Sequence, residues 1–243
     1  MGLARYRRCV VRVRHAPARH MNARTFTLFI CFAVRFSFAQ GTFQNLNFEN
    51  ATVVPIPNDP SGHIQFTPAF PGWTGYLGGS GISLVNYNSL NIGSSGIGLL
   101  DPGYPGGSRI AGNYTAVLQA GQLGFQPDAS MAQRGLIPAG TMSLHFFAGE
   151  DFRGGVVASI DGQALNLSVL QTFSGYNELG ADISAFAGQT VELRFTRPAV
   201  VAGANLFLDD ISFSPNPVPE PSAWVLLVLG SALFWCVTRR WRK

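Results

Sequence analysis

The stretch from Thr190 to Pro198, TVELRFTRP, alternates apolar and polar side chains. Val191, Leu193 and Phe195 occupy every second position of it. Because successive side chains of a β-strand point to opposite faces, these three share one face. The stretch therefore predicts a strand that buries one side and exposes the other.

Two further stretches extend this pattern. Residues 141–150, TMSLHFFAGE, alternate in the same way, with Met142, Leu144 and Phe146 on one face. Residues 156–169, VVASIDGQALNLSV, predict a β-hairpin, because their central Asp-Gly pair suits a two-residue turn between strands.

The rest of the chain between its ends consists of short runs with strand character, separated by turns rich in Gly, Pro, Asn and Asp. The predicted strands are Thr42–Phe48, His63–Thr67, Ile82–Tyr87, Tyr114–Gln119, Thr141–Ala148, Gly155–Ile160, Ala164–Leu170, Thr190–Thr196 and Leu206–Ser212. No long stretch there has helical periodicity. We therefore expect an all-β fold, with one antiparallel β-sandwich domain over residues 40–214.

The charge of the chain is divided by segment. The whole chain of 243 residues carries a formal charge of +4, but residues 40–218 hold five arginines, no lysine and twelve acidic residues, a net charge of −7. A domain of this charge does not track a nucleic-acid backbone. The cysteines Cys9, Cys31 and Cys236 all lie in the terminal segments, so no disulfide is expected in the domain.

Residues 1–39 predict a secretory signal peptide. From Met21 the chain has a short basic start, an apolar run and then small residues at Ser37 and Ala39, so we expect signal peptidase to cleave after Ala39. The arginine-rich residues 1–20 have three explanations: a long basic region of the signal, a start assigned too early, or a nucleic-acid-binding arm. We favour Met21 as the true start.

The other end of the chain has three parts. Residues 215–222 form a proline-rich linker, residues 223–238 an apolar transmembrane helix, and residues 239–243 a basic cytoplasmic tail. At ~1.5 Å per residue, the uncharged run from Ala223 to Val237 reaches only ~22 Å, less than the ~30 Å hydrocarbon layer. This end is either a permanent anchor or a sorting address that is removed.

The order of these parts resembles the PEP-CTERM sorting signal of exported bacterial proteins. Its motif residues are Val218, Pro219, Glu220, Pro221 and Ser222, and its basic cluster is Arg239, Arg240, Arg242 and Lys243. The resemblance implies processing by an exosortase. The precursor would then sit in the inner membrane of a Gram-negative-type bacterium, and the product at the cell surface or in the extracellular matrix. The short apolar run favours such a transient address over an anchor.

Three patterns in the domain resemble galactose-binding-like jelly rolls, the architecture of many carbohydrate-binding modules. They are NLNFENA at residues 45–51, GADISAFAGQTVELRF at 180–195 and NLFLDDISFS at 205–214. They look like the opening, penultimate and closing elements of such a domain. The resemblance implies a jelly-roll-like β-sandwich.

The same resemblance implies a structural Ca²⁺ where the first and last strands approach each other. Glu49, Asp209 and Asp210 match those positions, and Ca²⁺ takes oxygen ligands. The alternative is that one aspartate of the pair points to solvent while the other caps a turn or pairs with an arginine.

Carbohydrate-binding modules stack sugar rings on aromatic side chains. Trp73 and Tyr76, in the stretch PGWTGY, are the ligand-contact candidates, and the alternative for Trp73 is a place in the core.

Catalysis finds no support in the sequence. No Gly-x-Ser-x-Gly elbow occurs, and the two histidines of the domain, His63 and His145, are far apart in sequence. The expected function is non-catalytic: binding or structuring envelope or matrix polysaccharide. The alternatives are a polysaccharide-active enzyme on the same scaffold and an adhesin that binds proteins.

Overall fold

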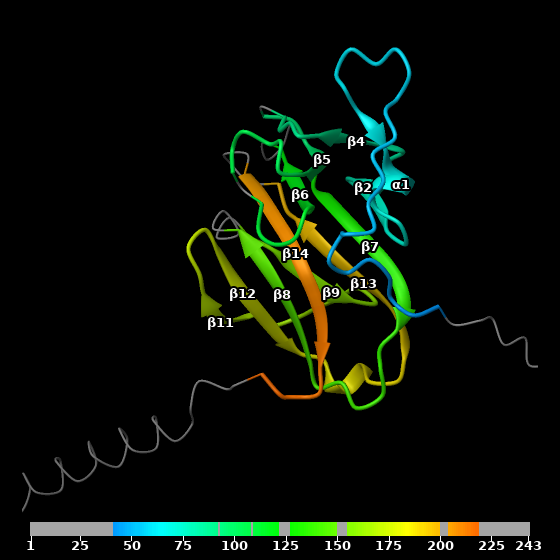
Figure 1. Ribbon diagram of the computed structural model, residues 1–243. Coiled ribbons are helices and arrows are strands. Elements are labelled where there is room, and N and C mark those ends of the chain that lie inside the picture. The colour runs from blue at the N-terminus through cyan, green and yellow to red at the C-terminus, as the bar shows by residue number, and fades with distance from the viewer. Residues whose placement is uncertain are drawn as a thin grey trace, which may run out of the picture. The chain divides into compact units, whose positions relative to one another are not determined.

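The computed structural model describes residues 41–91, 93–107, 109–121, 127–149, 155–199 and 204–218. These residues form two β-sheets that face each other, as predicted for a β-sandwich (Figure 1). The predicted signal peptide and transmembrane helix lie outside the described residues. None of the helices in the described ranges is long and apolar enough to cross a membrane.

The larger sheet has the order β1-β4-β5-β6-β14-β8-β12-β11. Its strands are β1 (Ile64–Gln65), β4 (Leu84–Tyr87), β5 (Gly96–Leu100), β6 (Thr115–Ala120), β14 (Ala204–Ser214), β8 (Ser143–Gly149), β12 (Tyr176–Asp182) and β11 (Ser168–Thr172). The long strand β14 runs through the middle of this sheet between β6 and β8 (Figure 1).

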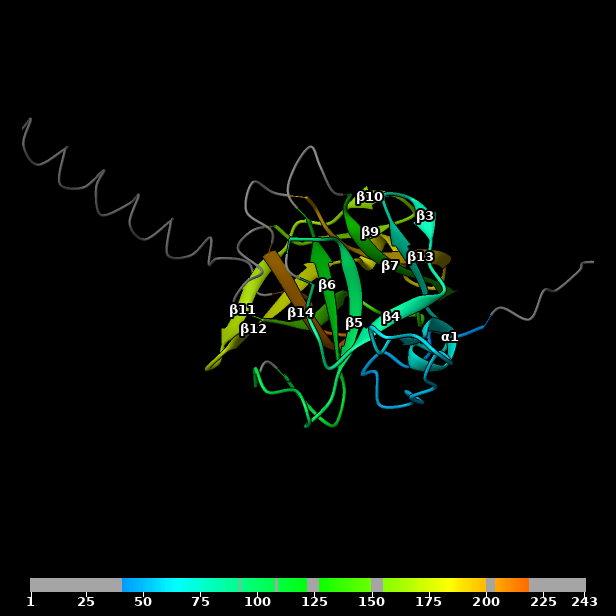
Figure 2. The same ribbon diagram turned by 90° about the horizontal axis from the view of Figure 1, so that it is seen from above.

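The smaller sheet has the order β10-β9-β13-β7-β2-β3. Its strands are β10 (Gln163–Ala164), β9 (Val157–Ile160), β13 (Thr190–Arg197), β7 (Ala129–Leu136), β2 (Thr74–Leu77) and β3 (Ser80–Gly81). The short helices α1 (Phe66–Ala69) and η2 (Ser184–Phe186) connect strands. Seen from above, the two sheets form separate layers (Figure 2).

The core lies between the sheets and follows the alternation in the sequence. Val191, Leu193 and Phe195 of β13 are all buried, and so are Leu144 and Phe146 of β8. The rings of Phe146 and Phe195 pack edge to face across the two sheets, 4.9 Å between centroids. Burying each such side chain contributes about 1.5–3 kcal/mol, which fixes the register of both strands.

The alternation fails at one position. Met142 precedes β8 and is 39% exposed, so it does not share the core face with Leu144 as predicted. The β9–β10 hairpin, in contrast, is confirmed at its turn. Its turn residues Asp161 and Gly162 have φ values of 45° and 82°, the positive values that a type I′ turn requires. The strand predicted at residues 164–170 is divided, however, between β10 in the smaller sheet and β11 in the larger sheet.

Some predicted strands do not form, and some observed strands were not predicted. Residues 42–48 make only an isolated bridge at Thr42 and then turn, with Asn45 and Phe48 at positive φ. Helix α1 replaces the second half of the strand predicted at residues 63–67. Strands β2, β3, β5, β7 and β12 were not predicted.

The expected antiparallel arrangement also has an exception. Strands β4 and β5 pair in parallel, with Asn86 opposite Gly98 and Tyr87 opposite Leu99. The chain makes this pair by a loop that returns from the end of β4 to the start of β5. That loop builds the pocket described below.

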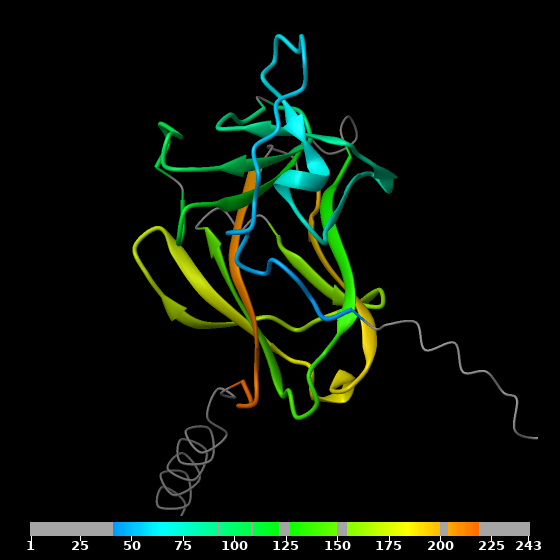
Figure 3. The same ribbon diagram turned by 45° about the vertical axis from the view of Figure 1, so that its right-hand side comes forward.

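The first described segment does approach the last strand, as expected. The amide of Ile211 in β14 donates a hydrogen bond to the carbonyl of Leu46 at 3.0 Å. Figure 3 shows this segment, in blue, beside β14, in orange.

Candidate functional site

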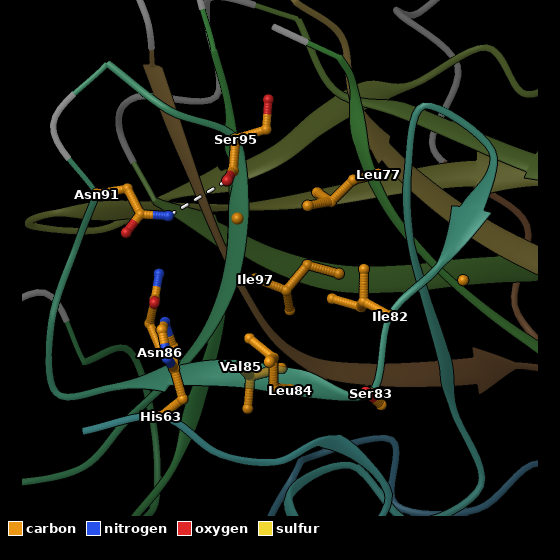
Figure 4. A pocket seen from close by; sticks show the side chains of 12 residues that line it. His63, Leu77, Ile82, Ser83, Leu84, Val85, Asn86, Asn91, Ser95 and Ile97 are labelled. Atoms are coloured by element: carbon orange, nitrogen blue, oxygen red, sulfur yellow. Dashed lines mark hydrogen bonds between the residues drawn. The ribbon is translucent and has the colours of Figure 1, made fainter. Parts of the chain in front are cut away.

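A cavity of about 370 Å³ opens beside the parallel pair β4–β5. We call it the Asn86 pocket. It is lined by His63, Leu77, Gly81, Ile82, Ser83, Leu84, Val85, Asn86, Asn91, Ser95, Gly96 and Ile97. Figure 4 shows Asn86, Asn91 and His63 on one side of it and Leu77, Ile82 and Ile97 on the other. The pocket thus has a polar half and an aliphatic half.

Asn86 is the central polar side chain. It is 5% exposed, and its Nδ2 group has no hydrogen-bond partner among the described residues. Leaving a buried amide donor unpaired costs about 1–3 kcal/mol. In Figure 4 the amide points toward Asn91 and the cavity. A ligand atom that accepts a hydrogen bond would remove this cost.

Asn91 is held in place by hydrogen bonds of the β4–β5 loop. Its backbone amide donates to Gln119 Oε1 at 2.8 Å, and its carbonyl accepts from Gln119 Nε2 at 3.2 Å. Its side-chain Nδ2 donates to the carbonyl of Ser95 at 3.2 Å. The loop therefore presents the Asn91 amide on a fixed backbone.

Gly96 makes room for the two amides. A Cβ atom at this position would lie 2.5 Å from Asn91 Nδ2 and 3.1 Å from Asn86 Nδ2. Any larger residue would push these groups aside. The same distances show that the two Nδ2 groups lie close to each other over the Gly96 backbone.

The aliphatic half joins the pocket to the core. Ile97 and Val85 are 1% exposed and belong to the main core cluster, whereas Leu84 on the rim is 42% exposed. Leu77 and Ile82 are partly buried against the same cluster. This half offers an apolar surface backed by rigid packing.

The pocket is nearly free of charge. His63 is the one ionisable side chain among the described lining residues, and its Nδ1 lies 2.5 Å from Asp59 Oδ2. Hydrogen bonds from the Ser61 amide, first of all, and from His63 hold the pKa of Asp59 below its usual value. His63 is therefore already engaged with a carboxylate, and the described lining offers no other cation to an anionic ligand.

The two serines of the pocket are not arranged for nucleophilic catalysis. Ser95 Oγ donates to the Pro127 carbonyl at 2.5 Å and accepts from the Gly121 amide at 3.1 Å. His63 bonds to Asp59 and to no serine of the described lining. The arrangement can bind an uncharged ligand.

Trp73, predicted as a ligand contact, is a core residue. It is 5% exposed, packs against Phe48 and Phe195, and donates its Nε1–H to the Asn45 carbonyl at 3.1 Å. Its ring is covered by Phe48 and by Phe195 of β13, so it offers no face to a sugar.

Tyr76 lies on the outer face of the smaller sheet, away from the pocket lining. The guanidinium of Arg194 covers its ring, 4.5 Å from the centroid. Arg194 is itself held by Glu192, at 2.9 Å, and by Ser130, at 3.1 Å. One face of the Tyr76 ring is therefore already occupied.

The predicted calcium ligands do not form a cation site. Glu49 Oε1 accepts the backbone amides of Asn113 and Tyr114 at 2.7 and 2.9 Å, and Oε2 accepts Asn113 Nδ2. These bonds contribute to a lowered pKa of Glu49, against the desolvation that would raise it. Donors, not oxygen ligands, surround this carboxylate.

Asp209 and Asp210 differ from each other, as the alternative to calcium proposed. Asp209 is 1% exposed and accepts from Thr115 Oγ1 at 2.7 Å and from the Ala111 amide at 3.2 Å, while Asp210 is exposed. Burial raises the pKa of Asp209 to about 7. In the described ranges, no three His, Cys, Asp or Glu side chains are grouped to hold a metal.

The residues of the sorting signal are mostly outside the described part of the chain. Val218 is its last described residue and is half-buried. Pro219, Glu220, Pro221, Ser222 and the basic cluster Arg239, Arg240, Arg242 and Lys243 lie beyond it.

Sequence patterns missed the Asn86 pocket. Alternation places Asn86 on the opposite face of the strand from Val85. A polar residue on that outer face is predicted to be exposed to solvent. Only the loop that folds back to β5 buries it. The run of glycines at residues 93, 96 and 98 was the available signal, because glycine in a strand marks close approach of other groups.

A second polar cluster lies on the outer face of the larger sheet. His145 contacts Glu178 through Nδ1 at 2.7 Å and Ser143 Oγ through Nε2 at 2.9 Å. The order serine, histidine, carboxylate is that of a hydrolase triad. However, Ser143 is fully buried, and its hydroxyl donates to the Asn216 carbonyl at 2.6 Å. The hydroxyl proton thus points to the chain that follows β14.

No family model matches this chain, and no curated protein matches it. Among solved structures it is similar to the secreted serine protease VesC from Vibrio cholerae, with 11% identical residues and a TM-score of 0.29. The similarity covers 71% of this chain and 45% of that one, so the chain spans less than half the length of VesC. A likeness at this TM-score carries no conclusion about fold family or activity.

Proposed function

We propose that the chain is an exported, non-catalytic protein whose jelly-roll-like domain binds envelope or matrix polysaccharide through the Asn86 pocket. The observation that carries the ligand-binding part is the unpartnered Nδ2 of Asn86, which is buried beside a cavity. A buried donor without a partner is costly, and a site that binds hydrogen-bonding ligands explains its presence.

The chemistry of the pocket favours a sugar over other small ligands. A sugar residue presents hydroxyl oxygens on its edges and C–H groups on its faces, which suits a pocket with amides on one side and aliphatic side chains on the other. The cavity of about 370 Å³ is large enough for one such residue. The lack of charge suits a neutral sugar.

The terminal segments support the export part of the proposal. The signal pattern of residues 1–39 and the PEP-CTERM-like residues 215–243 are both typical of secreted bacterial proteins. In this proposal signal peptidase and an exosortase process the chain, and the product acts at the cell surface or in the matrix. A structural Ca²⁺ is no part of the proposal.

Glycan-array binding of the full chain tests the ligand-binding part. The protein is kept in a detergent without a sugar headgroup, and the variant Asn86→Leu is run beside Asn166→Leu, a control at an exposed loop position outside the pocket lining. We expect binding by the wild type and by the control and loss of binding by Asn86→Leu. Binding that survives Asn86→Leu contradicts the site, and release of shortened glycan favours the alternative of a polysaccharide-active enzyme.

A further inference from the structure

We infer that the Asn86 pocket recognises the acetamido group of a neutral N-acetylated sugar residue. This inference rests on the proposed function and names the ligand class of the same site. It follows from the donors, the wall and the charge of the pocket taken together.

The donors select a carbonyl oxygen. Asn86 Nδ2 and Asn91 Nδ2 lie close together over Gly96, 3.1 and 2.5 Å from the position that a Cβ there would take. Asn86 Nδ2 has no partner, and Asn91 Nδ2 has one bond, at 3.2 Å, for its two hydrogens. A carbonyl oxygen accepts two hydrogen bonds and brings no hydrogen of its own between two donors.

An acceptor lies next to these donors. No described residue donates to Asn91 Oδ1, although the backbone of Asn91 is bonded on both sides by Gln119. An acetamido group presents its carbonyl oxygen and its N–H on opposite edges of a trans amide. The two Nδ2 groups therefore meet the carbonyl oxygen, and Asn91 Oδ1 is an acceptor on the pocket side that the ligand's other polar groups can use.

The wall selects a methyl group. Sugar modules that stack whole rings use aromatic side chains, and the described lining of this pocket has none. Leu77, Ile82 and Ile97 present methyl groups instead (Figure 4). An acetyl methyl, a few ångströms from its own carbonyl, fits an aliphatic surface that faces two amides.

The charge of the pocket excludes acidic N-acetylated sugars. Its one ionisable lining residue, His63, already contacts the Asp59 carboxylate at 2.5 Å, so the described lining offers no uncommitted cation to a ligand carboxylate. The expected ligands are therefore neutral N-acetylhexosamines at a chain end or within a polysaccharide.

Ligand-observed NMR on the full chain tests this inference, with N-acetylglucosamine, N-acetylgalactosamine, glucosamine, glucose and galactose as probes. We expect saturation transfer to be strongest at the acetyl methyl protons. The sugars without an acetyl group should bind with an affinity that is lower by at least about tenfold. Asn86→Leu should abolish the effect and Asn166→Leu should leave it unchanged. Gly96→Ala, which fills the space between the amides, should weaken binding as Asn86→Leu does.

The outcomes separate the two proposals. If glucose or galactose binds as well as the acetylated sugars, and Asn86→Leu removes that binding, the acetamido assignment is wrong and the sugar site stands. If a folded wild type binds none of the probes and no glycan on the array, both the sugar-binding site and the acetamido assignment are wrong. Thermal melting of each variant shows whether it is folded.

Discussion

The Nδ1 atom of His145 on β8 lies 2.7 Å from Oε1 of Glu178 on β12. On its other side, His145 bonds to Ser143, whose hydroxyl donates to the Asn216 carbonyl. Ser143 Oγ therefore lies within hydrogen-bond distance of both the Asn216 carbonyl and the His145 ring. A chain of three side chains thus holds the segment that leads toward the proposed sorting motif.

Ser143→Ala should loosen this segment. The change removes the hydrogen bond to Asn216 and leaves His145 Nε2 without its partner, at a cost of about 1 kcal/mol. We expect faster amide exchange in the peptide over residues 214–218, measured by mass spectrometry, with Ser174→Ala, an exposed loop position, as the control. Unchanged exchange in Ser143→Ala would show that the segment is held by other contacts.

Asp209 should make the domain more stable as the solution is acidified from pH 8 to pH 5. Burial raises its folded pKa to about 7 from 3.8, so its contribution is full below pH 4 and is lost as the pH rises through 7. The effect approaches about 1.4 kcal/mol per pH unit at its steepest. Four other carboxyl groups have lowered pKa values, so the stability that they contribute is lost only at more acidic pH. They are Glu49, Asp59, Asp101 and Asp182.

Denaturant unfolding of wild type and Asp209→Asn across this range measures that contribution. Asparagine keeps an oxygen for Thr115 and does not ionise, so the difference in unfolding free energy between the two proteins should change with pH by up to about 2 kcal/mol. A difference that is constant from pH 5 to pH 8 contradicts the raised pKa.

Asn86→Leu should not destabilise the domain. Leucine keeps the branched shape of asparagine, although it is larger, and removes the cost of an unpaired amide, so we expect an unchanged or higher melting temperature. The comparison is Asn45→Leu, which also removes a buried side chain with an unpaired Nδ2. It loses the hydrogen bond that the Asn50 amide donates to Asn45 Oδ1 at 2.9 Å and places leucine at a positive φ, so it should be destabilised. A clear loss of stability in Asn86→Leu would mean that Asn86 serves the fold.

Trp73→Ala should lower the free energy of unfolding by about 3–5 kcal/mol, because it empties the core between Phe48 and Phe195. Trp73→Phe should cost less and reports mainly the lost bond to the Asn45 carbonyl. Tyr76→Phe, at a half-buried position, is the control. Urea unfolding measures all three, and a Trp73→Ala protein of wild-type stability would contradict a core role.

The parts of the fold that could be predicted are those that local chemistry controls. Alternation in β13 requires one buried face, and the Asp-Gly pair at residues 161–162 requires a hairpin. The strand predicted at residues 42–48 does not form, because Asn45 and Phe48 adopt positive φ values that interrupt a strand. The alternation of side chains gives no information on backbone angles. Strands β5 and β7 were missed because they lack the alternation of a half-exposed strand. All residues of β5 are buried, and in β7 only Arg134 is exposed and Leu136 half-buried.

The sequence by itself determined that the chain has an acidic, lysine-free β-domain between two terminal segments with targeting patterns, because composition, periodicity and charge are local properties. Only the tertiary structure decided which polar groups are buried without partners. Trp73 became core because Phe48 and Phe195, from distant parts of the chain, pack against it. Asn86 became a pocket donor because the β4–β5 loop returns in parallel and brings Asn91 and Gly96 beside it. Burial of this kind depends on contacts between segments, and a pattern within one segment carries no record of them.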